Sequence, residues 1–192
     1  MRRRVDPSPI VVLACVGTLL GPAFAQPGGI LAPEASDGAG RTVASPAETQ
    51  RVFAAVDDWL RASGQEPLDL RDPEGVAGAS ITLRLDEAVV AFAARISPGA
   101  DNVVATATAA RDQLREAFYT PADGWRGGVL EAVRLDLELA GQRTPLPGAS
   151  WAQAARLTSP GVDALAMDLG GRVAAVFPSR QIRLGFGPAR AL

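Results

Sequence analysis

A tryptophan and an arginine lie side by side in a glycine-flanked loop in the middle of the sequence. Trp125 and Arg126 stand between Gly124 and the pair Gly127-Gly128. Loops on a rigid scaffold often carry binding residues, and an indole ring beside a guanidinium group can stack on a flat ligand or on a sugar. A tryptophan that covers the edge of the core is the simpler alternative, because this side chain is often partly buried. We therefore predict Trp125 and Arg126 as ligand-binding residues and keep the alternative open.

Asp163 is the candidate for acid-base chemistry. It stands in an otherwise apolar stretch, Val162 to Met167, where burial would favour the neutral acid and suit it to general acid catalysis. With a second carboxylate across a cleft it would form a glycosidase-like pair. The simpler alternative is a residue of the turn before a strand, hydrogen-bonded to the backbone. Asp163 is thus the one candidate catalytic residue.

Two further acidic pairs are predicted to be structural. Asp57 and Asp58 are neighbours on a predicted helix, so their side chains point about 100° apart and cannot share a substrate. They are expected to be solvated and to face Arg61 one turn later. Asp86 and Glu87 occupy the tip of a predicted hairpin, where no burial would shift their titration.

The basic residues and the cysteine exclude several kinds of enzyme. The chain has no lysine and no histidine, so all nineteen basic residues are arginine. A Ser-His-Asp triad, a Schiff-base lysine, a P-loop lysine and a histidine-ligated zinc are therefore impossible. Cys15 is the only cysteine, and it lies in a segment predicted to be removed. No Asp-x-Asp-x-Asp calcium loop is present, so we predict neither a metal nor a cofactor.

The charge balance bears on the partner. Removal of the segment from Met1 to Ala25 takes away three arginines and one aspartate, which moves the formal charge from -2 to -4. A mildly acidic protein with scattered arginines is poorly suited to non-specific binding of nucleic acid or of an anionic membrane. The predicted partner is accordingly an unidentified protein or a small-molecule ligand, and not a nucleic acid.

The elements that must position these residues include two predicted hairpins. The first runs from Ala79 to Ser97 with Asp86-Glu87 as its turn, although this turn lacks the usual glycine. This register collects large apolar residues on one face. They are Ile81, Leu83, Leu85, Ala88, Val90 and Phe92.

The second predicted hairpin lies between Gly161 and Ser179. A three-residue loop, Leu169-Gly170-Gly171, would place Asp168 opposite Arg172. A two-residue loop would instead pair Leu169 with Arg172 and split the large apolar residues between the two faces, so patterning favours the first register. The face expected from it contains Leu165, Met167, Val173, Ala175 and Phe177.

Two helices and one more strand complete the predicted elements. Ser45, Pro46 and Glu48 form a capping box for a helix that ends near Gly64. Asp101 is predicted to cap a helix from Asn102 to Phe118, whose apolar stripe is Val103, Ala107, Ala110, Leu114 and Ala117 and whose solvated face is Arg111, Asp112, Arg115 and Glu116. Leu130 to Ala140 alternates as a half-exposed strand, with Leu135, Leu137 and Leu139 inward and Arg134, Asp136 and Glu138 outward.

The fold class follows from these elements. We predict a single α+β domain over residues 45–185, with an antiparallel sheet of about five strands made of two hairpins plus one strand. Two main helices pack on it, together with one or two short ones at Ser150 to Leu157 and Ser179 to Leu184. Residues 26–44, rich in glycine and proline, are expected to be a flexible linker. Residues 186–192 are expected to be a tail or the start of a truncated helix.

The segment from Met1 to Ala25 has the pattern of an export signal. Arg2 to Arg4 precede an apolar run from Ile10 to Leu20, and Ala23-Phe24-Ala25 forms a small-x-small cleavage site before Gln26. Eleven apolar residues are too few for a helix across a bilayer core of about 30 Å. A retained signal-anchor and a lipoprotein box ending at Cys15 are the alternatives. The mature chain is therefore predicted to be periplasmic or extracellular, without a membrane span.

Part of the second hairpin resembles a known family. Gly161-Val162-Asp163-Ala164-Leu165, Gly170-Gly171-Arg172 and Val176-Phe177-Pro178-Ser179 are similar to the C-terminal part of AMMECR-type domains, mainly over residues 161–180. Ala164 replaces the family's glycine, and the leucine-arginine-glycine-cysteine-isoleucine-glycine motif has no counterpart. The resemblance implies a general α+β order over Ala79 to Ser179 and transfers no site residue.

The predicted function is that of a non-catalytic exported module that binds a protein or a small ligand. The missing nucleophiles and bases favour this function. A carboxylate-based hydrolase, glycosidase-like, is the alternative, because Asp and Glu are the only acid-base groups left apart from Tyr119. A third hypothesis makes the chain the leading domain of a longer exported protein, because a new helix is predicted to start at Pro188.

Overall fold

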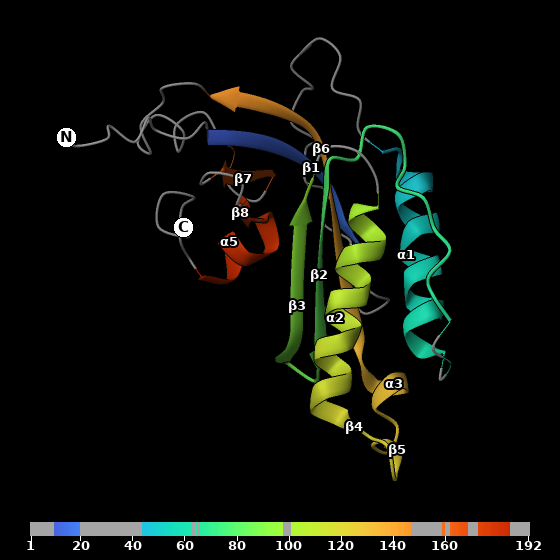
Figure 1. Cartoon of the computed structure of the whole chain (residues 1–192). Helices are drawn as coiled ribbons and strands as arrows, with labels where there is room; N and C mark the ends of the chain where they lie inside the picture. Colours follow the sequence, from blue (N-terminus) through green and yellow to red (C-terminus); the bar gives the residue numbers. More distant parts are fainter. Residues whose placement is uncertain are drawn as a thin grey trace, which may run out of the picture.

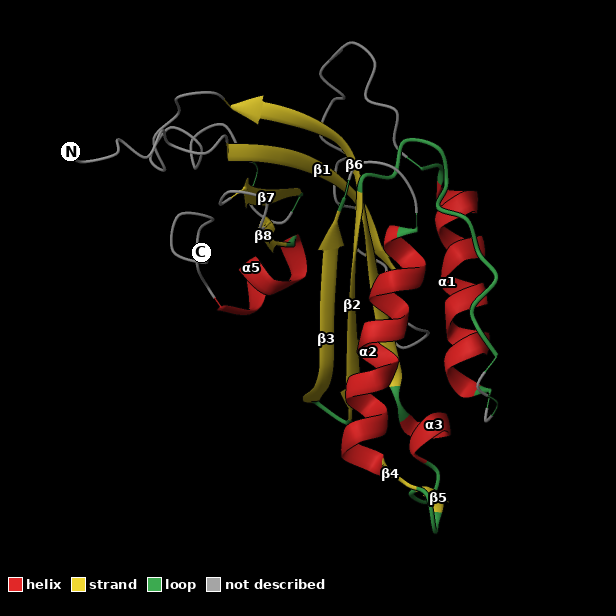
Figure 2. Ribbon diagram, viewed as in Figure 1, coloured by secondary structure: helices red, strands yellow, loops and turns green. Residues whose placement is uncertain are grey.

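A six-stranded antiparallel sheet forms the centre of the protein (Figures 1 and 2). The computed structural model of the chain describes residues 10–19, 44–62, 64, 66–97, 101–146, 159, 162–168 and 173–184. In spatial order the strands are β3 (Ala88–Ile96), β2 (Gly78–Leu85), β6 (Arg134–Leu146), β1 (Ile10–Leu19), β7 (Asp163–Asp168) and β8 (Val173–Val176). The α+β class and the two hairpins are confirmed. The single strand between them is present but runs from Arg134 to Leu146, and Leu130, where it was predicted to begin, belongs to the helix α3 (Val129–Ala132).

The sheet contains one strand that the sequence did not predict. β1 pairs antiparallel with β6 on one side and with β7 on the other. Its residues, Ile10–Leu19, are the apolar part of the predicted export signal, and a composition with several β-branched residues suits a strand as well as a signal. These pairings are present in the uncut chain, and cleavage after Ala25 would remove β1 from between β6 and β7. The cleavage itself stays a prediction.

The first helix, α1 (Pro46–Arg61), begins as predicted. The hydroxyl of Ser45 accepts a hydrogen bond from the backbone N of Glu48, and the Glu48 carboxylate accepts one from the backbone N of Ser45 at 2.9 Å. Hydrogen bonds from Ser45 lower the pKa of Glu48. The apolar stripe points at the sheet, where Val52, Val56 and Leu60 are buried.

The second helix, α2 (Asn102–Phe118), is capped differently from the prediction. Asp101 has a left-handed φ of 63° and its side chain makes no capping hydrogen bond. Instead the carboxylate of Asp72 accepts hydrogen bonds from the backbone N of Asn102 at 2.7 Å and of Val103 at 3.0 Å. The cap comes from a loop thirty residues earlier, which no local pattern could indicate. Below it, Val103, Ala107, Ala110 and Leu114 are buried against the sheet, whereas Ala117, which was predicted in the same stripe, is exposed.

The β2–β3 hairpin has the predicted turn and a shifted register beyond it. Leu85 lies opposite Ala88, so Asp86-Glu87 is the turn, and Asp86 adopts φ 53°, a left-handed conformation that aspartate tolerates better than most residues. A register shift between Leu83 and Arg84 then places Phe92 opposite Thr82. Phe92 is therefore on the other face from Leu83, because an extra residue in one strand reverses the side-chain alternation after it.

The predicted register of the β7–β8 hairpin is wrong. Leu165 lies opposite Val176 and Asp168 opposite Val173, which is the register that apolar patterning disfavoured. The physical reason is size complementarity: Phe177 is fully buried with the small residues Ala164 and Ala166 of β7. Residues 169–172, the helix predicted at 150–157, the tail at 186–192 and residues 26–43 of the linker lie outside the described residues.

The two faces of the sheet are covered by different elements. α1 and α2 lie on one face and bury the main core, which includes Leu135, Leu137 and Leu139 of β6. The helix α5 (Pro178–Leu184) covers part of the other face. Asp136 and Glu138 lie on this other face, opposite the leucines, as predicted, but they are 6% and 3% exposed, so the predicted exposure of this face is wrong. The leucine half of the alternation is confirmed.

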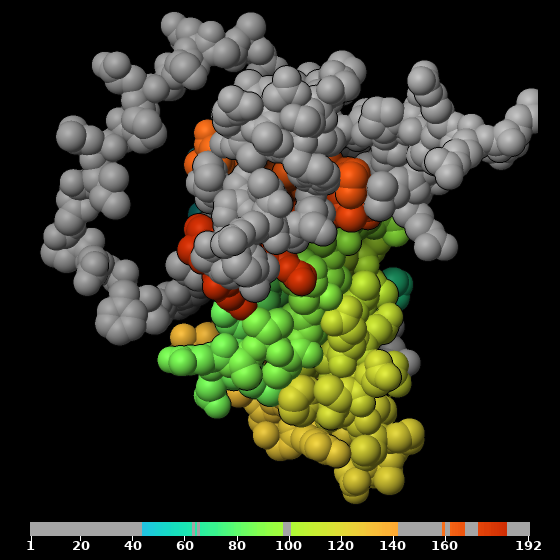
Figure 3. Space-filling view, turned by 90° about the vertical axis from the view of Figure 1, so that its left-hand side faces the viewer, coloured from blue at the N-terminus to red at the C-terminus, as the bar shows by residue number. Residues whose placement is uncertain are grey.

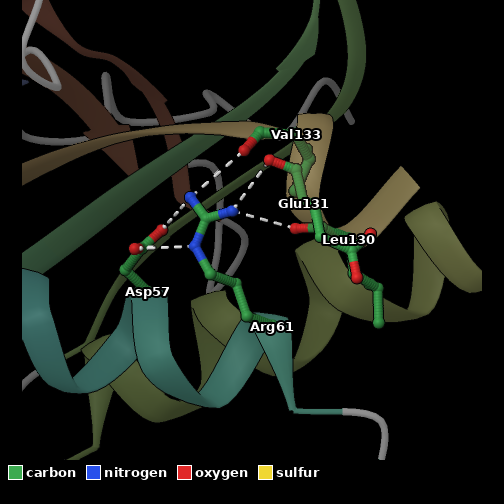
Figure 4. A network of polar contacts seen from close by, with 5 residues as sticks. All are labelled: Asp57, Arg61, Leu130, Glu131 and Val133. Carbon is green, nitrogen blue, oxygen red and sulfur yellow. Dashed lines mark hydrogen bonds and ion pairs between the residues drawn. The ribbon is translucent and has the colours of Figure 1, made fainter. Parts of the chain in front are cut away.

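A short segment connects α2 to β6 and is tied to α1. It contains β4 (Tyr119–Thr120), β5 (Gly124–Trp125) and α3 (Val129–Ala132). Arg61 of α1 donates to the backbone oxygens of Leu130, Glu131 and Val133 at 2.9, 3.2 and 3.4 Å (Figure 4). Its guanidinium also forms the predicted ion pair with Asp57 at 2.8 Å. Asp57 is therefore a structural residue that orients Arg61.

Candidate aromatic-arginine site

A groove of about 310 Å³ lies between α1, α2 and the β4–β5 ribbon. Three aromatic rings and two guanidinium groups line it together with two carboxylates, a combination common in sites for small ligands. We call it the aromatic-arginine groove. Its lining residues are Trp59, Gly64, Glu66, Pro67, Thr108, Arg111, Asp112, Arg115, Tyr119 and Trp125.

The rings and guanidinium groups of the groove stack on one another. The guanidinium carbon of Arg111 lies 4.4 Å from the ring centroid of Trp59, and that of Arg115 lies 4.7 Å from the ring centroid of Tyr119. The rings of Tyr119 and Trp125 meet edge to face, with centroids 5.5 Å apart. These contacts hold the aromatic side chains in defined positions before any ligand arrives.

The β4–β5 ribbon explains the position of Trp125. Tyr119 ends α2 and pairs across the ribbon with Trp125. Gly124 has φ 71°, which a glycine adopts without strain, and the chain can therefore reverse just before the tryptophan. Trp125 is half-buried against the main core and also lines the groove. Trp125 therefore has the position expected from both hypotheses: it covers the edge of the core, and it also lines a groove.

The side chain of Arg126 does not share the groove with that of Trp125. Its side chain is exposed and does not line the aromatic-arginine groove. Its backbone N donates to the carbonyl oxygen of Phe118 at 2.9 Å, which continues the ribbon. Successive residues of a strand point to opposite sides, so neighbouring positions rarely serve one ligand. The structure divides the predicted pair and keeps Trp125 at the groove.

Arg111, and not Arg126, is an arginine that lines the groove together with Trp125. The sequence places it on the solvated face of α2, which is wrong: Arg111 is 7% exposed. Its guanidinium donates to the carbonyl oxygens of Ala62 and Gly64 at the end of α1, where a cation also meets the negative end of the helix dipole. Burial and the neighbouring guanidinium of Arg115 lower the pKa of Arg111. Arg111 therefore joins α1 to α2 at the groove.

Asp163 has a structural role: it is a residue at the start of a strand whose side chain is hydrogen-bonded to the backbone, which was the simpler alternative. It is 5% exposed at the start of β7, and its carboxylate accepts a hydrogen bond from the backbone N of Ser159 at 2.8 Å. Its carbonyl oxygen accepts one from the side-chain amide of Gln181 at 3.0 Å. Figure 1 shows β7 and β5 at opposite ends of the molecule. The structure does not bring Asp163 together with Trp125.

Two buried carboxylates on β6 were missed as candidates. Asp136 forms ion pairs with Arg84 at 2.6 Å and with Arg183 of α5 at 3.5 Å. Glu138 accepts hydrogen bonds from the backbone N and the hydroxyl of Ser179 at 2.8 and 2.6 Å. Burial raises the pKa of Glu138, although the hydrogen bonds from Ser179 act in the opposite direction.

A sequence signal for these carboxylates did exist. Ser80 and Thr82 of β2 lie opposite Glu138 and Asp136, so both strands are polar on the same face. A polar row on two adjacent central strands predicts a covering element with matching polar groups, because buried polar groups need partners. α5 provides partners for the two carboxylates: Ser179 binds Glu138, and Arg183 pairs with Asp136.

A second and larger cleft, of about 840 Å³, lies at the end of the sheet near the β2–β3 turn. Charged residues line much of it, but several of them already pair with each other: Asp57 with Arg61, and Asp136 with Arg84 and Arg183. Ion pairs that satisfy one another leave fewer groups for a ligand. The aromatic-arginine groove is therefore the stronger candidate.

Comparisons with protein-family models, with curated proteins and with solved structures found no match. Within the described residues, no group of three or more histidine, cysteine, aspartate or glutamate side chains is placed to hold a metal ion. In that same part of the chain, none of the helices has the length and apolar character needed to cross a membrane.

Proposed function

We propose that the protein is an exported, non-catalytic module that binds a small ligand with a ring face, a sugar above all, in the aromatic-arginine groove. The observation that supports this function is the convergence of Trp59, Tyr119 and Trp125 with Arg111 and Arg115 around one groove. The rings offer faces for stacking, and their positions are set by the contacts described above.

The chemistry of the lining favours a sugar over a strongly charged ligand. Arg111 and Arg115 are balanced by two carboxylates, those of Glu66 and Asp112, so the described lining has no large net charge. Aromatic faces suit the apolar face of a sugar ring, and guanidinium and carboxylate groups can hydrogen-bond its hydroxyls. The groove volume of about 310 Å³ is at the lower end of ordinary ligand sites, which fits one or two sugar rings.

The test is binding of a disaccharide panel (cellobiose, maltose and N,N'-diacetylchitobiose), followed by isothermal titration calorimetry and tryptophan fluorescence. Loss of a central aromatic contact typically weakens binding about tenfold or more, and we expect this for Trp125→Ala. The matched control is Arg126→Ala, which removes an exposed side chain next in sequence but outside the groove. Absence of binding at millimolar sugar, or equal affinities of Trp125→Ala and the parent chain, would refute the proposal.

We further propose that the domain is a diverged relative of AMMECR-type domains that has acquired an export signal. The support is the sequence pattern in residues 161–180 together with an α+β order of elements between Ala79 and Ser179. The proposal adds no site residue. An experimental structure of an AMMECR-type domain with a different strand order in the corresponding region would contradict it.

A carboxylate-based hydrolase is the second candidate, favoured by one observation. Asp136 and Glu138 lie on the same face of β6, and Glu138 has a raised pKa while Asp136 is ion-paired with arginines. Carboxylates in such unequal environments can divide the roles of acid and base. Both side chains are buried and α5 lies over them, so a substrate would have to displace α5. Hydrolysis of a glycoside panel that is abolished by Glu138→Gln would support this candidate against the binding module.

A further inference from the structure

β1 separates two strands of the sheet that would otherwise face each other. It pairs antiparallel with β6 on one side and with β7 on the other, and Ile10 to Leu13 have a partner on both sides. Neighbouring strands lie roughly 4.8 Å apart, so β6 and β7 are held about 9.6 Å apart, the width that one strand needs. The space that β1 fills, between residues 137–146 of β6 and 163–167 of β7, is called the strand slot below.

Cleavage of the export signal would empty the strand slot. This inference rests on that part of the proposed function, the cut after Ala25, which removes all of β1. The peptide groups of β6 and β7 that β1 binds would then face each other without hydrogen-bond partners. Such groups need a partner inside a protein, and an open strand edge is a place where another strand adds.

The helix α5 holds β7 in place relative to β6 independently of β1. The side-chain amide of Gln181 donates to the carbonyl oxygens of Asp163 in β7 and Val176 in β8, at 3.0 and 3.3 Å. Ser179, two residues earlier, binds the carboxylate of Glu138 in β6 through its backbone N and its hydroxyl. The helix is therefore bound both to the β7–β8 hairpin and to β6, on the two sides of the slot.

Apolar and aromatic contacts fix the same unit. Phe177, directly before α5, is buried in one cluster with Ala140 of β6 and Ile96 of β3. The guanidinium carbon of Arg180 lies 4.9 Å from the ring centroid of Phe92 in β3. Figure 3 shows the red atoms of the C-terminal residues next to the green atoms of β3. The hairpin and α5 are thus attached to strands on the far side of the slot.

Direct pairing of β6 with β7 would break these contacts. It would move one strand by roughly 4.8 Å relative to the other. It would also create a parallel pair, because both strands run antiparallel to β1, and parallel pairing is slightly less stable per residue. An added strand restores the missing hydrogen bonds without such a movement.

The side chains along the slot indicate an apolar occupant. Among the described side chains there, the charged ones are Glu138 and Asp163, which already accept hydrogen bonds from Ser179 and Ser159. A charge brought in by the occupant would therefore be buried without a partner. β1 itself, Ile10–Leu19, has no charged residue. Leucine and alanine residues beside it are at most 1% exposed in the uncut chain: Leu137, Leu139 and Ala140 of β6, and Ala164, Leu165 and Ala166 of β7.

The cut chain has no spare strand for this place among its described residues. Each described strand after Gln26 is already paired in one of the two sheets. The occupant must therefore come from another protein molecule.

We propose that the strand slot of the cut chain receives an uncharged, apolar, extended segment of an exported partner protein, which runs antiparallel to β6 and to β7. Backbone pairing on both sides gives the affinity, and the exclusion of charge gives the selectivity. This surface is distinct from the aromatic-arginine groove, because β7 and β5 lie at opposite ends of the molecule (Figure 1).

The experiment opens the slot in the full chain. Val12 pairs with Thr144 of β6 and with Leu165 of β7, and proline is not tolerated in a strand paired on both sides, so Val12→Pro should release β1. Cell-free synthesis without membranes keeps residues 1–25 in place. The probe is a fluorescein-labelled peptide of residues 1–20 with Cys15→Ser. Fluorescence anisotropy should show saturable binding to the Val12→Pro chain and binding at least about tenfold weaker to the parent chain, whose own β1 fills the slot.

The chemistry of the occupant is tested with a matched pair of peptides. Val12→Glu in the probe places a carboxylate inside the slot and should weaken binding at least about tenfold. Val5→Glu adds the same charge before β1 begins and should leave the affinity unchanged. If the Val12→Pro chain does not fold by itself, the unaltered probe must restore the circular dichroism of the parent chain.

The exported chain that begins at Gln26 should bind the probe as tightly as the Val12→Pro chain does. Absence of binding together with absence of restored circular dichroism, or equal affinities of the Val12→Glu and Val5→Glu probes, would overturn the proposal. A dimer of the exported chain that excludes the probe would also overturn it, because a second copy would then fill the slot. An exported chain that keeps residues 1–25 would overturn it through its premise, which mass spectrometry detects separately. Trp125→Ala should leave probe binding unchanged, so failure of the sugar site is distinguishable from failure of the slot.

Discussion

The cap of α2 allows a sharp test of the tertiary structure against the sequence pattern. Replacing Asp72 by alanine removes the acceptors for the backbone N–H groups of Asn102 and Val103, both of which are fully buried. A typical protein hydrogen bond contributes about 1 kcal/mol net, and the loss of a helix cap costs about 0.5 to 2 kcal/mol. Two lost bonds place Asp72→Ala near the upper limit of that range, so we expect about 2 kcal/mol of destabilisation.

The matched variant is Asp101→Gly, at the position that the sequence pattern favours as the cap. Asp101 makes no side-chain capping bond and has φ 63°, a conformation that glycine adopts without strain, so its stability should be unchanged or slightly raised. Urea unfolding followed by circular dichroism measures the free energy of unfolding of both variants. In thermal unfolding, about 2 kcal/mol corresponds to a fall in Tm of roughly 4 to 8 °C for a chain of this length. A loss for Asp101→Gly as large as that for Asp72→Ala would refute the assignment of the cap.

Two further predictions concern Glu138 and the export signal. The folded state holds the proton of Glu138 more tightly than the unfolded chain, because burial raises its pKa. Its contribution to stability is therefore complete below the ordinary pKa of a glutamate and is lost as pH rises through the raised value. Urea unfolding over a pH series should show this decline relative to Glu138→Gln, and equal pH profiles would contradict it. For the signal, the mass of the exported protein should correspond to a chain starting at Gln26. Such a cleavage would remove β1, which pairs with β6 and with β7 in the uncut chain. An exported chain that keeps the segment from Met1 to Ala25 would contradict the prediction.

Several elements could be predicted because their causes lie close together in the chain. The capping box at Ser45 and Glu48 closes over three residues, and the turn at Asp86 joins neighbouring strands. The ion pair of Asp57 with Arg61 spans one helical turn. Interactions of this range depend on local geometry alone, which the 3.6-residue and 2-residue periods describe.

Predictions of other features were wrong because these features depend on contacts between distant segments. The register of β7 and β8 was set by the fit of Phe177 to Ala164 and Ala166, and not by the grouping of large residues. The polar face of β6 was predicted to meet solvent. It is buried because α5, about forty residues later in the chain, covers it, and the local sequence of β6 does not indicate this contact. An alternating pattern shows that the two faces differ, but it does not show which face is buried.

The candidate site divides in the same way. The sequence by itself determined the available chemistry, a chain without lysine or histidine in which arginine, carboxylates and aromatic rings must do any binding. It also determined that Trp125 stands in a glycine-flanked loop. Only the tertiary structure decided that Arg111 and Arg115, and not Arg126, lie with it in the groove. The reason is that residue types are properties of the chain, whereas the set of side chains around a cavity depends on how α1, α2 and the ribbon pack together.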